Sequence, residues 1–144
     1  METKPLLAPF YLIAASLVGV ADTLYLSYNH YLNLIPSCSI GGCEVVLTSP
    51  YATPWGIVSL SYLGLVFYLF MLCLMAFLAY DPRSKGLRLA ALLYTGFGLA
   101  CSIFFELFQF FVIHALCIYC GLSAATTLAL FGLALWHFIK TKEN

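Results

Sequence analysis

Two pairs of cysteines carry the chemistry that this sequence could perform. Cys117 and Cys120 are three residues apart within a long apolar run, and Cys38 and Cys43 lie in a segment that contains glycines. On a helix, residues three apart share one face and are separated by about one turn (~5.4 Å) along the axis. If a helix begins near Cys117, its free backbone N–H groups favour a thiolate there. Such a dithiol could exchange electrons with the other pair.

Each pair also has a simpler explanation. Cys38 and Cys43 could form a static disulfide that staples a loop in an oxidising compartment. Cys117 and Cys120 could be small buried hydrophobic residues. The four thiols could also form a tetrahedral zinc site, but the wide spacing of the first pair and the apolar surroundings do not favour it. We therefore expect no metal.

The composition indicates the class of protein. The chain has 144 residues, of which 63% are hydrophobic and 8% are charged. Soluble domains have about 25% charged residues, so we expect an integral membrane protein whose surface contacts lipid. The formal net charge is zero, which argues against a nucleic-acid partner because no basic surface is available. The length predicts a single domain over residues 1–144, with room for four spans and little else.

Four apolar stretches approach or exceed the ~20 residues that cross the hydrocarbon core of a membrane. They run from about Pro9 to Tyr28, from Ile57 to Ala79, from Leu87 to Phe111 and from Ala115 to Ile139. We therefore predict an all-α membrane protein, a bundle of four transmembrane helices. A long external loop joins the first and second helices, and Cys43 to Thr48 could form a short half-helix in it, ended by Pro50. Cys73 and Cys101 are deep in the second and third spans and are expected to be packing residues.

The positions of the basic residues predict the topology. With four spans, every Lys and Arg falls on one side, namely Lys4, Arg83, Lys85, Arg88, Lys140 and Lys142. The positive-inside rule puts this side, and both termini, in the cytoplasm. The loop with Cys38 and Cys43 and the Cys117 end of the fourth span then share the external side. This coincidence favours electron exchange between the two pairs over two unrelated roles.

Three other polar residues near the membrane are candidates for function. Asp22 and Glu106 lie toward the outer ends of their spans, where burial of an ionised group is costly. We expect both to be boundary carboxylates that reach water, with a role in proton uptake as the alternative. His114 precedes the fourth span and is expected to be an interfacial turn residue, although it could also donate a proton.

The order of these features resembles the vitamin K epoxide reductase (VKOR) family. The segment Cys43–Ala52 is similar to the half-helix segment of its prokaryotic members, and Ser61–Gly64 resembles the start of the second helix. Cys117-Ile-Tyr-Cys120 is similar to the active-site motif of the family. The similarity covers essentially the whole chain. In the analogous quinone-coupled DsbB family, the CxxC motif precedes the second pair, so the order here argues against that family.

The resemblance implies a four-helix bundle with a quinone, ubiquinone or menaquinone, near the CxxC motif. By motif position, Cys120 would face the quinone, Cys117 would exchange with Cys43, and Cys38 would meet a thioredoxin-like partner on the external side. Cys120 is also one turn deeper in the predicted helix, nearer a lipid-soluble oxidant. Ser49 corresponds to a Ser or Thr that lies near the quinone in the family. The fused thioredoxin-like domain of some bacterial members is missing, so we expect the partner to be a separate protein.

The expected function is therefore that of a membrane thiol–disulfide oxidoreductase that supports disulfide bond formation, in a prokaryotic plasma membrane. One alternative is reduction of a quinone or of vitamin K epoxide, as in vertebrate relatives. Two departures weaken this alternative, because Leu60 and Ala124 stand where the vertebrate enzymes have an Asn and a Tyr. The other alternative is a non-enzymatic membrane scaffold with a structural loop disulfide.

Overall fold

The computed structural model describes residues 4–39 and 41–142. In these residues the long helices are α1 (Lys4–Tyr31), α3 (Leu60–Tyr80), α4 (Lys85–Phe108) and α5 (Ile118–Lys142). The short elements are the helix α2 (Cys43–Leu47), the 3-10 turn η1 (Pro50–Ala52) and the π-helix η2 (Gln109–Ile113). Four helices are long and apolar enough to cross a membrane, and the described residues form no strand. The predicted all-α fold with a half-helix between the first two spans is confirmed.

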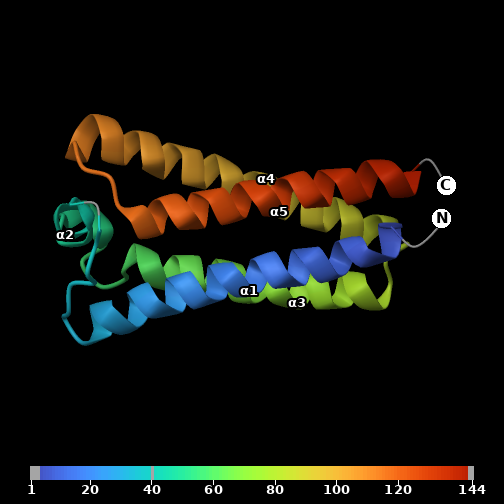
Figure 1. Ribbon diagram of the computed structural model, residues 1–144, viewed down its shortest axis with the longest axis horizontal. Coiled ribbons are helices and arrows are strands. Elements are labelled where there is room, and N and C mark those ends of the chain that lie inside the picture. The colour runs from blue at the N-terminus through green and yellow to red at the C-terminus, as the bar shows by residue number, and fades with distance from the viewer. Residues whose placement is uncertain (1–3, 40, 143–144) are drawn as a thin grey trace.

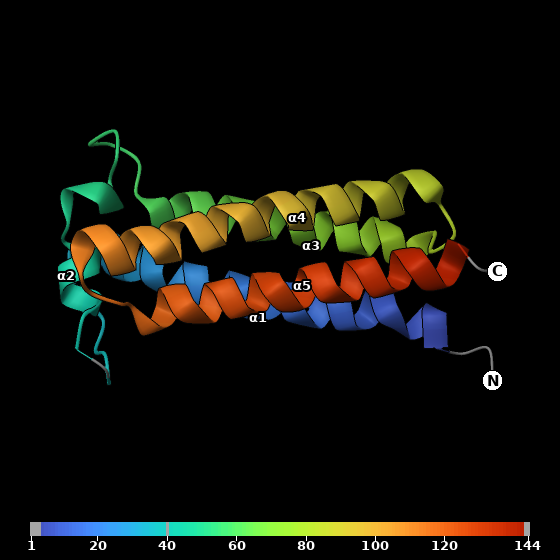
Figure 2. The same cartoon turned by 90° about the horizontal axis from the view of Figure 1, so that it is seen from above.

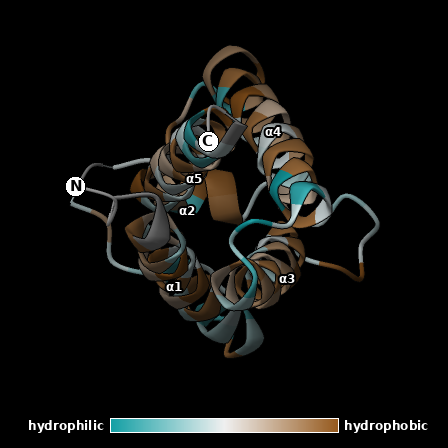
Figure 3. Ribbon diagram, turned by 90° about the vertical axis from the view of Figure 1, so that its right-hand side faces the viewer, coloured by the Kyte–Doolittle hydropathy of each residue, from teal (hydrophilic) through white to brown (hydrophobic). Residues whose placement is uncertain are grey.

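The four long helices form an elongated bundle (Figures 1 and 2). Helix α1 packs against α3 and α5, and α4 packs against α5 and less extensively against α3. Viewed along the bundle, the four helices stand at the corners of a quadrilateral, and α2 lies beyond their far end (Figure 3). The looser pairing of α3 with α4 leaves space inside one half of the bundle, where the candidate site is found.

The two ends of the bundle differ in what they carry (Figure 1). Both chain ends and the turn between α3 and α4 lie at one end, together with Arg83, Lys85 and Arg88. The loop after α1, α2, η1, η2 and the start of α5 lie at the other end. Both cysteine pairs are therefore at the end opposite the basic residues, as the charge pattern predicted.

All four long helices begin a few residues from the predicted starts, α1 and α4 earlier and α3 and α5 later, and the two late starts have a local reason. Helix α3 begins at Leu60, after the expected Ile57, because the Ser59 hydroxyl accepts a hydrogen bond from the Ser61 N–H at 3.3 Å and caps the helix. Helix α5 begins at Ile118, because His114 has a left-handed conformation (φ 56°) that ends η2. The segment between His114 and Ile118 is not helical, so Cys117 directly precedes the first turn of α5.

The half of the bundle near the chain ends holds the main hydrophobic core. Its buried residues are Leu12, Tyr68, Met71, Met75, Leu78, Ala91, Leu130 and Ala134. Helices α1 and α3 approach closely here, because a side chain at Gly19 would overlap the ring of Tyr68. Small residues that let helices approach are typical of packing in a membrane, where dispersion contacts replace the hydrophobic effect.

The structure corrects two expectations about residues in the spans. Cys73 is exposed on the outer surface of the bundle and does not pack in the interior. Asp22 does not reach water at the boundary, because it is only 7% exposed and neither carboxylate oxygen has a hydrogen-bond partner among the described residues. Its face of α1 is covered by neighbouring helices. By contrast, Cys101 is partly buried, and exposed His114 is the turn residue that was expected.

Candidate active site

Helix α2 brings Cys43 against the segment that leads into α5. Gly42, directly before α2, has φ +149°, a conformation that L side chains rarely adopt. A side chain at Gly42 would also overlap the backbone oxygen of Leu116. Glycine thus lets the start of α2 lie directly on the residue before Cys117. As a result, Cys43 and Cys117 are 0% and 2% exposed and form the centre of a small hydrophobic cluster.

The sulfur atoms of the two pairs are in contact. Cys38 and Cys43 form a disulfide, and Cys117 and Cys120 are free thiols. The Sγ atom of Cys117 lies 3.3 Å from the Sγ atom of Cys43. Thiol–disulfide exchange begins when a thiolate attacks one sulfur of a disulfide. Cys117 therefore lies close enough to the loop disulfide for such an exchange.

The same proximity is the basis for asking whether the cysteines hold a metal. The sulfur atoms of Cys38, Cys43 and Cys117 all lie within 4.8 Å of one another, close enough to ligate one ion. Metal binding requires thiolates, and two of these three sulfur atoms are bonded to each other. In this bonding state the cluster is arranged for exchange, and a metal would require the reduced loop pair.

The neighbours of Cys117 at the start of α5 favour its thiolate form. The Cys120 thiol donates a hydrogen bond to the Cys117 sulfur, and the backbone N–H groups of Cys120 and Tyr119 face it. These contacts outweigh the opposing effect of burial and lower the pKa of the Cys117 thiol to about 7. The backbone N–H groups act in the direction expected for the start of a helix, but the largest cause is the Cys120 thiol. The lowered pKa favours the thiolate, which is the nucleophilic form of cysteine.

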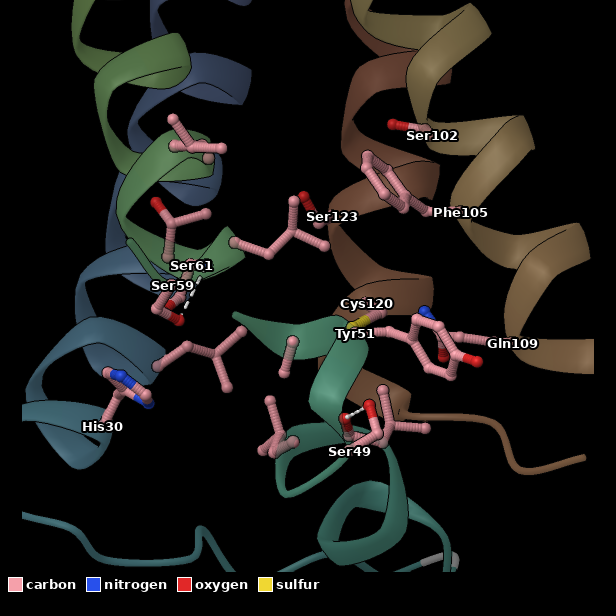
Figure 4. A pocket seen from close by; sticks show the side chains of 18 of the residues that line it. His30, Ser49, Tyr51, Ser59, Ser61, Ser102, Phe105, Gln109, Cys120 and Ser123 are labelled. Atoms are coloured by element: carbon pink, nitrogen blue, oxygen red, sulfur yellow. Dashed lines mark hydrogen bonds between the residues drawn. The ribbon is translucent and has the colours of Figure 1, made fainter. Parts of the chain in front are cut away.

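Cys120 faces a cavity of about 900 Å³ inside the bundle (Figure 4). All four long helices contribute to its walls, and so do α2 and η1. The walls are mainly apolar with a few polar groups, which is typical of sites for small organic molecules. The ring of Tyr51 packs edge-on against Phe108 with their centroids 4.9 Å apart, and Phe105 lies on the same wall as Phe108. The cavity therefore suits a flat, largely apolar ring next to Cys120.

The structure places the residues that the sequence singled out. All four cysteines lie at one end of the bundle, and Cys120 and Ser49 line the same cavity. The Ser49 hydroxyl donates a hydrogen bond to the Val46 carbonyl at 2.7 Å, which ends α2. Ser49 thus shapes the turn that carries the chain from the cysteine cluster to the cavity wall.

Sequence reasoning missed Gln109, the first residue of the π-helix η2. It is 4% exposed, lines the cavity, and its side-chain oxygen accepts the backbone N–H of Cys117 at 3.1 Å. Isolated π-turns within α-helices frequently occur at functional sites. The sequence did offer a signal, namely a glutamine within a phenylalanine-rich run, eight residues before the CxxC motif.

Two more residues, Cys101 and Glu106, line the cavity although the sequence did not place them there. Cys101 was expected only to pack, yet it lines the cavity. Glu106, predicted to be a boundary carboxylate, is partly exposed and also lines the cavity. Glu106 belongs as well to a smaller groove of about 300 Å³ along α4 and α5. An acidic side chain is thus available at the wall shared by the cavity and this groove.

The match to a known family agrees with this geometry. The model of the vitamin K epoxide reductase family matches residues 10–135, which include both cysteine pairs. The chain belongs to the vitamin K epoxide reductase family. A sequence search among curated proteins found no match. Because VKOR-family proteins are quinone-linked reductases, this VKOR-family chain is an oxidoreductase of the membrane.

Proposed function

We propose that this VKOR-family protein passes electrons from a reduced thioredoxin-like partner to a quinone and thereby supports disulfide bond formation in exported proteins. The electrons would travel through the Cys38–Cys43 pair and then through Cys117 and Cys120. The observation that carries the proposal is the 3.3 Å distance between the Sγ atoms of Cys117 and Cys43. No movement of a helix is required for the two pairs to exchange.

The proposed orientation puts both termini in the cytoplasm and the cysteine pairs on the external side of a prokaryotic plasma membrane. The support is the location of Arg83, Lys85, Arg88 and Lys140 at the end of the bundle opposite the cysteines. The positive-inside rule assigns that end to the cytoplasm. In this orientation the loop pair meets proteins that are being oxidised after export.

The first exchange takes place at Cys38, which is the more accessible sulfur of the loop disulfide. A thiolate of the partner attacks Cys38 and breaks its bond to Cys43, so that Cys43 leaves as a thiolate. The second thiol of the partner then attacks the mixed disulfide and releases Cys38. The partner leaves oxidised, and the loop pair has gained two electrons.

The second exchange takes place between the loop pair and the CxxC motif in its oxidised form. The Cys43 thiolate attacks Cys117 and breaks the Cys117–Cys120 bond, and Cys120 leaves as a thiolate on the cavity side. Cys38 then attacks Cys43, which restores the Cys38–Cys43 disulfide and releases Cys117. The bonding pattern in the structure, with a loop disulfide and two thiols in the CxxC motif, corresponds to the end of this sequence.

The cavity beside Cys120 fits a quinone in size and chemistry. The chemistry that ubiquinone or menaquinone supplies when bound is the acceptance of two electrons and two protons. Tyr51 and Phe105 would pack against the ring, and Ser49 would fix the wall next to it. The chain's own part is to hold the ring beside the Cys120 sulfur and to keep water out of the apolar interior.

The cavity also bears on whether an epoxide is the physiological substrate. Leu60 and Ala124, which stand where vertebrate relatives have an Asn and a Tyr, both line this cavity. Neither side chain can form a hydrogen bond, which favours the quinone over the epoxide. Efficient conversion of vitamin K epoxide with a dithiol donor, measured by product analysis, would reverse this preference.

The direct test is anaerobic mixing of the purified protein with a quinone and a reduced thioredoxin-like donor, while the quinone absorbance is followed. We expect one quinone to be reduced for each dithiol consumed. Cys120→Ala should block quinone reduction but still allow a Cys43–Cys117 mixed disulfide to form. Cys73→Ala, which removes an exposed thiol from the outer surface of the bundle, is the matched control and should turn over normally.

Two outcomes would contradict the proposal. Normal turnover by Cys120→Ala would remove Cys120 from the path. If changing all four site cysteines to serine left cellular disulfide formation untouched, and no mixed disulfide with a partner could be trapped, the loop disulfide would be a structural staple.

A further inference from the structure

Gln109 connects the end of α4 to the start of α5 through two separate hydrogen bonds. Its side-chain oxygen accepts the Cys117 N–H at 3.1 Å, and its backbone oxygen accepts the Ala115 N–H at 3.3 Å. Both bonds join the non-helical residues 114–117 to the end of α4. The Gln109 side chain therefore fixes the position of Cys117 against α2.

The orientation of the Gln109 carboxamide is determined by this contact. A backbone N–H can only donate, so the atom that faces Cys117 must be the carbonyl oxygen. The NH2 group, with two donors, must then point the other way. The same side chain lies beside Cys120, and Figure 4 shows the two residues together on the cavity wall. The group that Gln109 presents to the Cys120 sulfur is thus an N–H donor.

We propose that Gln109 is a positioning residue that makes Cys120, and not Cys117, the leaving sulfur when the Cys117–Cys120 disulfide is attacked. Its carbonyl oxygen holds Cys117 against Cys43, and its N–H group stabilises the thiolate that forms on Cys120. This inference rests on the proposed relay and adds the reason for its direction. A disulfide opens faster toward the sulfur whose thiolate is better stabilised.

The step involves only residues of this chain. The Cys43 thiolate supplies the electron pair of the new Cys43–Cys117 bond, and the Cys117–Cys120 bond breaks. Its electron pair stays on Cys120, which becomes a thiolate and accepts the Gln109 N–H. No electrons enter or leave, because one disulfide replaces another. The negative charge moves from the buried loop pair to the cavity wall, where the electrons are needed.

The test isolates this step in a Cys38→Ser background, in which Cys43 cannot return to its loop partner. Protein with one disulfide among Cys43, Cys117 and Cys120 has a free Cys120, a free Cys43 or, if Cys43 pairs with Cys120, a free Cys117, and the first two forms are the ones compared. Alkylation of the free thiol followed by peptide mass spectrometry gives the ratio of the two forms. With Gln109 present, we expect the form with free Cys120 and a Cys43–Cys117 bond to predominate at mildly alkaline pH.

Two substitutions distinguish hydrogen-bond donation to the Cys120 sulfur from the positioning of Cys117. Gln109→Leu loses both hydrogen bonds, whereas Gln109→Glu keeps an acceptor for the Cys117 N–H and loses the donor to Cys120. We expect both to lower the ratio of free Cys120 to free Cys43 by about tenfold, as for the loss of a hydrogen bond to a charged group. Thr126→Val is the control, because it removes another buried hydrogen bond of α5, to the Leu122 carbonyl, away from the cavity.

The possible results are distinct. A ratio that is unchanged in Gln109→Glu would overturn the inference, even if Gln109→Leu fails to fold, because the donor would then be irrelevant. An equal loss in Thr126→Val would also overturn it, since any buried hydrogen bond would then matter as much. Absence of the Cys43–Cys117 bond in the Cys38→Ser parent would instead refute the relay itself, and this inference with it.

Discussion

The same four helices pack in two different ways along their length. Toward the chain ends they enclose a core of apolar side chains such as Leu12, Met71 and Met75, all 0% exposed. Toward the other end they surround a cavity of about 900 Å³, bordered by Cys120, Ser49 and the α2 segment. One half therefore holds the helices together, and the other half leaves room for chemistry.

The difference shows how a small membrane protein can maintain a cavity. A void inside a bundle loses dispersion contacts along its walls, so the helices would close on it unless they were held elsewhere. Here the core near the chain ends fixes the helix positions, and α2 with η1 fills the opposite end. Substitutions in the two halves should consequently have separable effects, on stability in one and on electron transfer in the other.

The largest expected effect comes from substituting one residue in each half. Cys117→Ser should reduce quinone reduction to the uncatalysed background, because a hydroxyl cannot take part in disulfide exchange, while thermal unfolding changes little. Leu12→Ala should cost about 2–5 kcal/mol of stability through the cavity it leaves, yet transfer electrons normally below its unfolding temperature. Anaerobic quinone assays and thermal unfolding measure both. Equal loss of stability and activity in both variants would abolish the distinction.

A smaller but still large effect is expected at the contact between α2 and α5. Gly42→Ala introduces a side chain that overlaps the Leu116 carbonyl oxygen, and so moves Cys43 away from Cys117. A displacement of about 1 Å of reacting groups can cost about 100-fold in rate. Stopped-flow measurement of exchange between the pairs tests this. Gly41→Ala is the control, since nothing lies within 4 Å of a side chain there, and a similar loss in it would count against the contact.

A moderate effect is expected from filling the cavity. Ala124→Leu projects into the space beside Cys120 and should slow quinone reduction about tenfold, as when a pocket is altered by a few carbon atoms. Exchange between the cysteine pairs should be unaffected. Ala125→Leu, on the adjacent groove that does not include Cys120, serves as the control. The idea fails if both variants reduce quinone at the same rate in steady-state assays.

The smallest effect concerns the acidity of Cys117. Its pKa of about 7 lies below the usual thiol value, so the reactive thiolate is present above pH 7 and is lost as the pH falls through that value. Cys120→Ala removes the largest cause of this shift and should raise the pKa of Cys117 toward the ~8.5 of a free thiol. The pH dependence of Cys117 alkylation measures the midpoint. An identical midpoint in both proteins would assign the shift to the backbone alone.

Much of this architecture could be predicted from the sequence, because it depends on local patterns. Four long apolar stretches separated by polar or proline-containing segments define the spans, and the basic residues define the two ends. The spacing of Cys117 and Cys120 places both on one face of a helix that starts beside them. These features follow from composition and periodicity, without knowledge of how the helices pack.

The rest depends on which face of each helix meets a neighbour. The apolar pattern of α3 does not show that Cys73 lies outside, because lipid and protein interior favour the same residue types. For the same reason, Asp22 could not be recognised as buried. The π-helix that begins at Gln109 could not be predicted either, because a phenylalanine-rich run has no polar face that would reveal a change in the helical period.

The cysteines in the middle of the proposed path are the least exposed. Cys38 and Cys120 are partly exposed, Cys120 toward the cavity, whereas Cys43 and Cys117 are 0% and 2% exposed. Small reducing agents in the surroundings can therefore reach Cys38 but not the buried contact between Cys43 and Cys117. Exchange between the two pairs is thus protected from side reactions with external thiols. The accessible sulfur of the loop pair, Cys38, is the one that a docked partner would cover.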